Sequence, residues 1–248
     1  MLSAEDNELL TRVGAGTPMG DLLRRFWFPA MLEVQIAEPD SPPVKLRLLG
    51  EDLVAFKATD VRIGILGAHC PHRRVLLYFG RNEECGLRCV YHGWKYDVDG
   101  NCLDMANVPT HQDFKQKVKA KAYKAAERNG VIWVYMGDQK NLPAMPDIAA
   151  IHIPEDEANI GFVMRECNWL QALEGDLDTS HVEFLHGGQR TATDYPKGDP
   201  RHWGTVHRDP EYAVAETDYG MMYGAYRPAD PGSTYWRIAH FMFPFWSI

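Results

Sequence analysis

Two cysteine–histidine pairs constrain the folding of this chain more than any other feature of its sequence. Cys70 and His72 form a C-x-H pair, Cys89 and His92 form a C-x2-H pair, and residues 73–88 separate the two pairs. Each pair is short enough to come from one loop. A chain with this pattern must therefore fold so that two separate loops converge on one site.

The four side chains are typical metal ligands, and two kinds of centre use two cysteines with two histidines. Structural zinc sites usually take their cysteines from one loop and their histidines from another. In a [2Fe-2S] cluster of the Rieske type, both cysteines bind one iron and both histidines bind the other. The pattern therefore favours such a cluster, held by Cys70, His72, Cys89 and His92, over zinc. His69 is an alternative to His72, but the C-x-H spacing favours His72.

Charge and composition indicate a protein of an aqueous, reducing compartment. The net charge is −8, and the interspersed charges argue against a basic surface for nucleic acid. The longest apolar runs fall short of the roughly 20 residues of a spanning helix, and the acidic N-terminus is unlike a signal peptide. We therefore expect a cytoplasmic protein that binds neither nucleic acid nor membrane. Cys85, Cys102 and Cys167 are expected to be buried, unreactive thiols.

Short apolar runs alternate with turn signals from about Val44 to Met136. Asp99-Gly100 and Asn129-Gly130 are typical of hairpin turns, so this stretch predicts an all-β domain. Residues 141–158 contain three prolines and little periodicity, and we place the domain junction there.

The remainder of the chain predicts a mixed domain. Residues 161–167 indicate a strand, Asn168 with Gln171 resembles a capping box at the start of a helix, and Gly187-Gly188 ends that helix. Later segments indicate an antiparallel sheet. The predicted fold class is α+β: an all-β [2Fe-2S] domain at 44–140, followed by part of an α+β domain at 141–248. An N-terminal segment, 1–43, is expected to pack on the second domain.

A second candidate centre lies at the end of the predicted helix. Asp178 and His181 are one helical turn apart, but His186 would point about 140° from His181 at roughly 100° per residue. Both histidines can bind one metal only if the helix opens into a wide turn or ends near Gly187. Two imidazoles with a carboxylate are the ligand set of non-haem Fe(II) in oxygen chemistry. Taken alone, the segment fits two structural histidines better, but an electron carrier upstream favours iron.

The chain resembles the oxygenase component of the Rieske non-haem iron aromatic ring-hydroxylating oxygenases, and within them the phthalate 4,5-dioxygenase type. Four segments carry the resemblance: "LTRVGAGTPMGDLLRRFWFPA", "YFGRNEECGLRCVYHGWKYDVDGNC", "ERNGVIWVYMG" and "NWLQALEGDLDTSHVEFLHG". They are distributed over essentially the whole chain.

This resemblance implies a function and a set of cofactors. Cys70, His72, Cys89 and His92 would hold the cluster, and His181 and His186 would hold mononuclear Fe(II). Asp178 matches the aspartate that, in the family, links a cluster histidine of one subunit to an iron-binding histidine of its neighbour. The protein would activate O2 and hydroxylate a small aromatic acid. A separate reductase, with or without a ferredoxin, would supply electrons from NAD(P)H, and the assembly would be a homotrimer or stacked trimers.

Two departures from the family pattern stand out. The family usually has a glycine after "CPHR", whereas this chain reads Arg73-Arg74-Val75, with Arg74 at the place of that glycine. A bulky residue there is expected to strain the loop or shift the potential of the cluster. The third iron ligand of the family is a carboxylate well over a hundred residues after the histidines, whereas this chain ends 62 residues after His186. We therefore expect a truncated chain that carries the cluster and holds mononuclear iron poorly. A Rieske monooxygenase or O-demethylase, and a non-catalytic Rieske electron-transfer protein, stay open as alternatives.

Overall fold

The computed structural model describes residues 2–154, 156–196 and 198–248. The chain divides into two compact units, one reaching to Met164 and one from Arg165 to Ile248. Each unit has its own antiparallel sheets.

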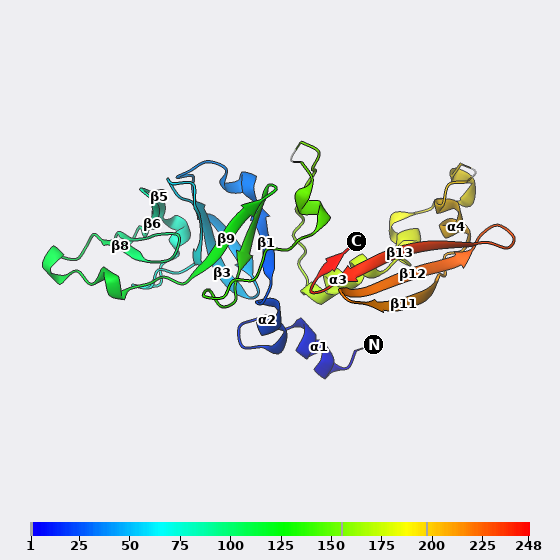
Figure 1. Cartoon of the computed structure of the whole chain (residues 1–248), viewed down its shortest axis with the longest axis horizontal. Coiled ribbons are helices and arrows are strands. Elements are labelled where there is room, and N and C mark those ends of the chain that lie inside the picture. Colours follow the sequence, from blue (N-terminus) through cyan, green and yellow to red (C-terminus); the bar gives the residue numbers. More distant parts are fainter. Residues whose placement is uncertain (1, 155, 197) are drawn as a thin grey trace. The chain divides into compact units, whose positions relative to one another are not determined.

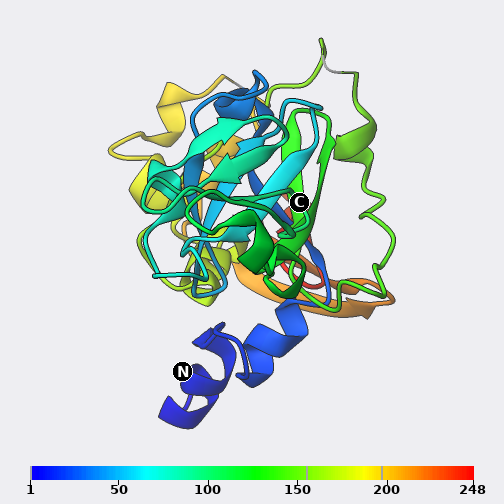
Figure 2. The ribbon, with the colours of Figure 1, turned by 90° about the vertical axis from the view of Figure 1, so that its left-hand side faces the viewer.

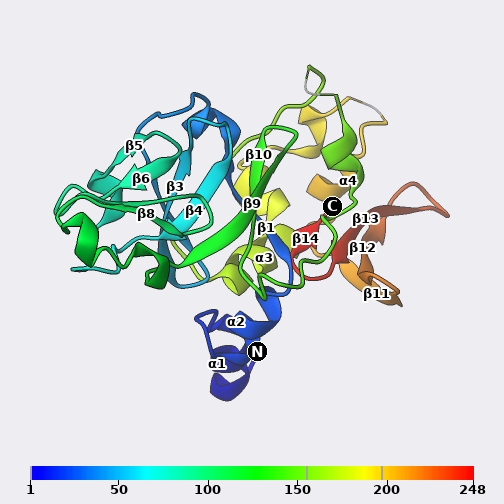
Figure 3. The same cartoon turned by 60° about the vertical axis from the view of Figure 1, so that its left-hand side comes forward.

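A six-stranded sheet forms the centre of the first unit. Its strands, in spatial order, are β1 (Trp27–Leu32), β10 (Val131–Tyr135), β9 (Ala122–Arg128), β4 (Ile63–Gly67), β3 (Glu51–Lys57) and β2 (Val44–Leu48). Figure 3 shows β9, β4 and β3 side by side, and β9 and β3 are also labelled in Figure 1. Along β3 the residues Leu53 to Phe56 are all buried, because alternate side chains enter two different cores. The sheet is therefore covered on both faces.

A smaller four-stranded sheet lies beside it (Figure 3). Its strands are, in order, β5 (Arg81–Glu83), β6 (Gly86–Arg88), β7 (Trp94–Tyr96) and β8 (Cys102–Met105). Leu87, Trp94 and Tyr96 share one core with Val54 and Phe56 of β3. Both cysteines of the predicted cluster belong to this core. The predicted all-β domain is confirmed, including the turns at Asp99-Gly100 and Asn129-Gly130.

The N-terminal residues begin with two short helices, α1 (Ala4–Thr11) and α2 (Pro18–Leu23), which are coloured blue near the N-terminus in Figure 2. β1 follows them and pairs with β10. Trp27–Leu32, which lie within the predicted N-terminal segment 1–43, therefore belong to the sheet of the first unit. The two units also divide at 164/165 instead of at 140/141. Among the described residues of the first unit, 3-10 helices occur at Glu33–Ile36, Leu77–Phe79, Thr110–Gln112, Lys115–Lys117 and Ala149–His152.

The second unit combines short helices with a four-stranded sheet. The helical elements are α3 (Trp169–Leu177), the π-helical turn η6 (Val182–His186), η7 (Ala192–Asp194) and α4 (Arg201–Val206). The sheet contains, in order, β11 (Glu211–Thr217), β12 (Gly220–Pro228), β13 (Thr234–Met242) and β14 (Trp246–Ser247). The predicted α+β class with an antiparallel sheet is confirmed. The strand expected at 161–167 is wrong, because these residues form no ladder, and Cys167 is exposed.

Candidate metal centres

The first cysteine–histidine loop follows β4. The backbone N–H of Cys70 donates to the carbonyl of Val75 at 2.9 Å, and the N–H of Arg74 donates to the carbonyl of Cys70 at 2.9 Å. Arg74 has a φ of 62°, a left-handed conformation that is uncommon outside glycine. These bonds close a tight turn that buries Cys70 and leaves Arg74 exposed.

The second loop joins β6 to β7 and repeats this geometry. The N–H of Cys89 donates to the carbonyl of Trp94 at 2.9 Å, and the N–H of Gly93 donates to the carbonyl of Cys89 at 3.0 Å. Gly93 has a φ of 75°. The two loops thus share one backbone hydrogen-bond pattern, with Gly93 at the place that Arg74 takes in the first loop.

The predicted ligands of the two loops converge. The ring centroids of His72 and His92 lie 4.5 Å apart, and His72 stacks on Trp94 at 4.3 Å. Cys70 and Cys89 are each 2% exposed. Within the described part of the chain, the Nδ1 atoms of His72 and His92 are buried and have no hydrogen-bond partner. Both cysteines lie in one core and the two histidine rings lie together, which supports the prediction that all four residues belong to one site.

The chemistry of this site suits a metal cluster. Burial raises the pKa of the Cys89 thiol, and the neighbouring Cys70 adds to that shift. Burial and the charge of His92 lower the pKa of His72. The two imidazoles have Nδ1 atoms that no protein group in the described residues uses and that are therefore free to ligate iron, and a bound metal would ionise the thiols. The residues fit a [2Fe-2S] cluster.

Sequence reasoning missed two side chains that support the second loop. Arg88 donates from Nη1 to the carbonyl of Gly93 and to Asp104, both at 2.6 Å. The indole N–H of Trp94 donates to Asn107 at 2.7 Å. The sequence signal for Arg88 was its place directly before Cys89; nothing in the pattern pointed to Asn107.

The segment that carries the second centre is a helix interrupted by a wide turn. Asn168 caps α3 by accepting a hydrogen bond from the N–H of Gln171 at 2.9 Å, as predicted. The α-helix ends at Leu177, and Val182–His186 forms a π-helical turn closed by the bond from Gly187 N–H to the carbonyl of Val182 at 2.7 Å. This turn brings the ring centroids of His181 and His186 to 5.1 Å. The wide turn that two iron-binding histidines would require is present.

Asp178 lies where the α-helix ends and contacts the first of these histidines. Its Oδ1 accepts hydrogen bonds from the backbone N–H and the hydroxyl of Ser180, both at 2.7 Å, and its Oδ2 is 3.3 Å from Nδ1 of His181. Burial raises the pKa of Asp178, but these bonds and the nearby histidine outweigh burial and hold the pKa below its usual value. An ionised Asp178 can accept the Nδ1 proton of His181 and leave Nε2 for a metal.

A complete single-ion ligand set does not occur in the described residues. Over residues 2–154, 156–196 and 198–248, no group of three or more His, Cys, Asp or Glu side chains is placed to hold one ion. His181 and His186 fit two positions of an iron coordination sphere. Glu183, on the same turn, is buried and directed toward Arg227 instead.

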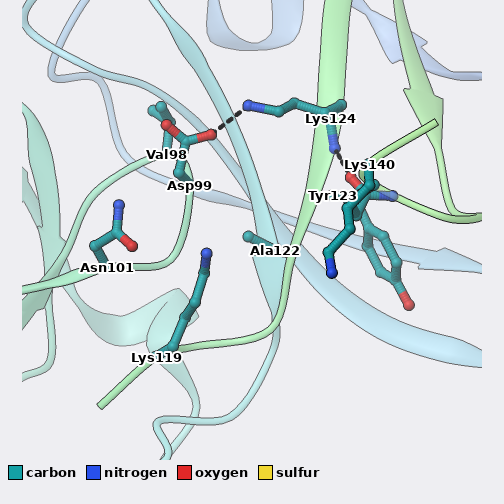
Figure 4. Close-up of a pocket in the computed structure, with 9 residues that line it drawn as sticks. Val98, Asp99, Asn101, Lys119, Ala122, Tyr123, Lys124 and Lys140 are labelled. Atoms are coloured by element: carbon teal, nitrogen blue, oxygen red, sulfur yellow. Dashed lines mark hydrogen bonds and ion pairs between the residues drawn. The ribbon is translucent and has the colours of Figure 1, made fainter. Parts of the chain in front are cut away.

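A cavity of about 510 Å³ opens elsewhere on the first unit, beside β9 (Figure 4). Lys119, Lys124 and Lys140 line it, and Lys124 pairs with Asp99. None of the predicted metal ligands contributes to it. The cavity is therefore separate from the predicted chemistry.

Two known families match the chain, one in each of its two parts. Residues 26–124 match the Rieske [2Fe-2S] domain, and residues 134–247 match the LigXa C-terminal domain-like family. The chain thus belongs to the Rieske non-haem iron oxygenases. This membership implies a [2Fe-2S] cluster and a mononuclear iron, the two cofactors that the sequence predicted.

Individual relatives support this assignment. The chain is 46% identical to the 3-chlorobenzoate-3,4-dioxygenase oxygenase subunit of Comamonas testosteroni, over 100% of this chain and 57% of the relative. It is 42% identical to the phthalate 4,5-dioxygenase oxygenase subunit of Pseudomonas putida, over 92% of this chain and 53% of the relative. The chain therefore spans little more than half the length of these two proteins.

The fold also matches a solved structure. Dicamba monooxygenase bound to dicamba superimposes with a TM-score of 0.68 at 21% identity, over 90% of this chain and 64% of that one. This similarity concerns the fold. In the parts of this chain that the structure describes, none of the helices has the length and apolar character needed to cross a membrane.

Proposed function

We propose that the protein acts as the oxygenase component of a Rieske aromatic ring-hydroxylating dioxygenase, with Cys70, His72, Cys89 and His92 as the cluster ligands. One observation carries this proposal. Two loops with the same backbone geometry bring together two buried thiols and two imidazoles, whose Nδ1 atoms are buried without a partner in the described residues. Unpaired buried nitrogens are costly unless they bind a ligand.

In the second unit, His181 and His186 bind mononuclear Fe(II), and Asp178 positions His181. When bound, the cluster carries single electrons and the iron activates O2 for hydroxylation of the substrate. The contribution of Asp178 is to hold the Nδ1 proton of His181, which fixes the tautomer that presents Nε2. Cys70 and Cys89 are each 2% exposed, so the iron that they bind would be on the buried side of the site.

The substrate is an aromatic carboxylic acid. Two relatives above 40% identity are named for 3-chlorobenzoate and phthalate. A separate reductase supplies the electrons, and the protein assembles as a trimer in the cytoplasm. Its functional domains are the cluster domain, with residues 44–140, and the catalytic domain, to which residues 141–248 contribute.

Metal analysis and labelled oxygen test the proposal together. Purified protein should contain two irons per two acid-labile sulfides. Because this chain is expected to hold mononuclear iron poorly, one further iron should bind only when Fe(II) is supplied, and His181→Ala with His186→Ala should remove only this further iron. With reductase, 3-chlorobenzoate or phthalate, and labelled O2, a product carrying two labelled atoms supports dioxygenation. One labelled atom identifies a monooxygenase or O-demethylase instead. If the cluster is intact and is reduced, but no product forms and no third iron binds, the protein acts only in electron transfer.

A further inference from the structure

The π-helical turn that carries the candidate iron ligands has an inverted burial pattern. Phe184 and Leu185, its large apolar residues, are 60% and 73% exposed, whereas the acidic Glu183 is 8% exposed. Among the residues of η6, Glu183 is the buried one. Burying a carboxylate costs free energy unless the carboxylate is paired. Glu183 therefore needs partners that offset its negative charge.

Two arginines from the neighbouring sheet surround this carboxylate. Arg227 of β12 places Nη1 at 3.4 Å from Oε1 of Glu183, and Arg237 of β13 places Nη1 at 3.7 Å from the same oxygen. The side chain of Arg227 is 0% exposed, and its Nε and Nη2 are buried without a partner in the described chain. Arg237 pairs in the ladder with Ala225, two residues from Arg227, so both arginines lie on one face of the sheet.

The backbone of α4 closes over this ion pair. A Cβ atom at Gly204 would lie 2.3 Å from Oε1 of Glu183 and 2.8 Å from Nη1 of Arg227. The carboxylate is thus confined by α4 on one side and by the arginines of the sheet on another. Removing it would leave the Arg227 charge buried beside a second arginine, which is strongly unfavourable.

We propose that Glu183 is a positioning residue: its carboxylate, held by Arg227 and Arg237, fixes the π-helical turn that sets the spacing of His181 and His186. Isolated π-helical turns are rare, and one needs support from outside its own backbone. In a regular helix the two histidines would diverge by about 140°. The inference rests on the proposed function in its claim that these histidines bind iron.

Hydrogen exchange at Gly187 reports the turn directly, because its N–H closes the π-helical bond to Val182. In the full-length protein, Glu183→Gln should accelerate exchange of this amide at least about tenfold. The rhombicity of the EPR spectrum of the Fe(II)–nitrosyl adduct should change, while the Rieske signal stays. The matched control is Glu174→Gln, the same substitution at an exposed position on α3, which should change neither. If Glu183→Gln does not fold, Arg227→Lys and Gly204→Ala test the same contacts.

A double variant separates the ion pair from either residue alone. Glu183→Gln with Arg227→Met removes both charges, so it should exchange more slowly at Gly187 than Glu183→Gln does. Unchanged exchange and an unchanged nitrosyl spectrum in the single variants, or strictly additive effects in the double variant, would overturn the inference. Wild-type protein that binds no third iron even when Fe(II) is supplied would instead overturn the proposed function, and the Gly187 measurement would still decide the role of Glu183 in the turn.

Discussion

Arg74 and Gly93 take the same place in two loops that are closed by the same pair of backbone hydrogen bonds. Both residues have left-handed φ values, 62° and 75°. For a residue with a Cβ this conformation costs roughly 1–2 kcal/mol, partly offset by the chain entropy that glycine loses on folding. Arg74→Gly should therefore raise the free energy of unfolding by about 0.5–1 kcal/mol, measured by urea unfolding followed by circular dichroism.

The matched control is Gly93→Ala, at the same place in the second loop, which should lower the free energy of unfolding. It adds a side chain at a left-handed φ, and the new Cβ would lie 2.8 Å from that of Ala106. An Arg74→Gly protein less stable than the wild type would show that Arg74 makes a favourable contact that outweighs its backbone cost. The sequence pattern already indicated strain at Arg74, and the positive φ gives that strain a geometric cause.

The cluster ligands make a second prediction at the scale of single residues. Cys70→Ser and Cys89→Ser should each abolish the visible absorption and the Rieske EPR signal, because in the proposed ligand set these two buried thiols are the ligands of one iron. Cys85→Ser should keep both, since Cys85 lies in the turn between β5 and β6, at the far end of β6 from Cys89. Bleaching of the Cys85 variant would show that the ligand set is wrong.

Residue spacing was informative for side chains whose chemistry is local, and weak where burial depends on tertiary contacts. The C-x-H and C-x2-H pairs predicted that two loops meet, and in the structure the histidine rings of these two loops lie 4.5 Å apart. Cys102 was predicted to be buried, and burial raises its pKa to about 11. Cys167 was predicted to be buried as well, but it is exposed, in a segment that forms no strand.

At the scale of elements, the segment around Asp178 shows what a sequence can specify. The cap at Asn168 is local and was predicted, and the divergence of His181 from His186 predicted that a helix would have to open. The π-helical register itself could not be predicted. We attribute it to Glu183, which pairs with a residue 44 positions later in the chain.

Asp178→Asn should leave the cluster and the mononuclear iron loaded while turnover falls by about 10- to 100-fold or more. The carboxylate contacts Nδ1 of His181 and is itself oriented by Ser180, so the substitution changes the electrostatics of the ligand and keeps the geometry. Iron analysis with single-turnover kinetics measures both quantities. Loss of iron would make Asp178 a ligand, and unchanged turnover would remove it from the mechanism.

At the scale of the whole molecule, the class of each unit followed from the sequence, but the strand order did not. Hairpins such as β9–β10 join strands that are neighbours in the chain, and typical turn residues between the strands predict these hairpins. The pairing of β1 with β10 joins residues about a hundred positions apart, and its register shifts between Pro29 and Met31. No local pattern specifies such a contact, so the N-terminal segment was not predicted to enter the sheet.

An ion-pair network ties this N-terminal part to the sheet and predicts a pH dependence. Glu51 of β3, 17% exposed in its side chain, accepts hydrogen bonds from Arg24, which follows α2, and from Lys121 and Tyr123. Burial raises the pKa of Glu51, but the three donors outweigh burial and hold the pKa below its ordinary value of 4.5. The carboxylate therefore contributes stability above about pH 4.5, and this contribution is lost as the pH falls through the lower folded-state pKa.

Glu51→Gln should lower the free energy of unfolding at pH 7 by about 2 kcal/mol, the order of hydrogen bonds to a charged group. Because only the wild type has a carboxylate to protonate, the difference between the two proteins should shrink steadily below pH 4.5. Urea unfolding at several pH values measures this difference, and any acid lability of the cluster is common to both proteins. The matched control is Asp52→Asn, the next residue on β3, whose pair with Arg47 is exposed; it should change stability by less than about 0.5 kcal/mol. A difference for Glu51→Gln that stays constant from pH 7 to pH 3 would mean that the charge of Glu51 contributes nothing to the attachment of the N-terminal helices.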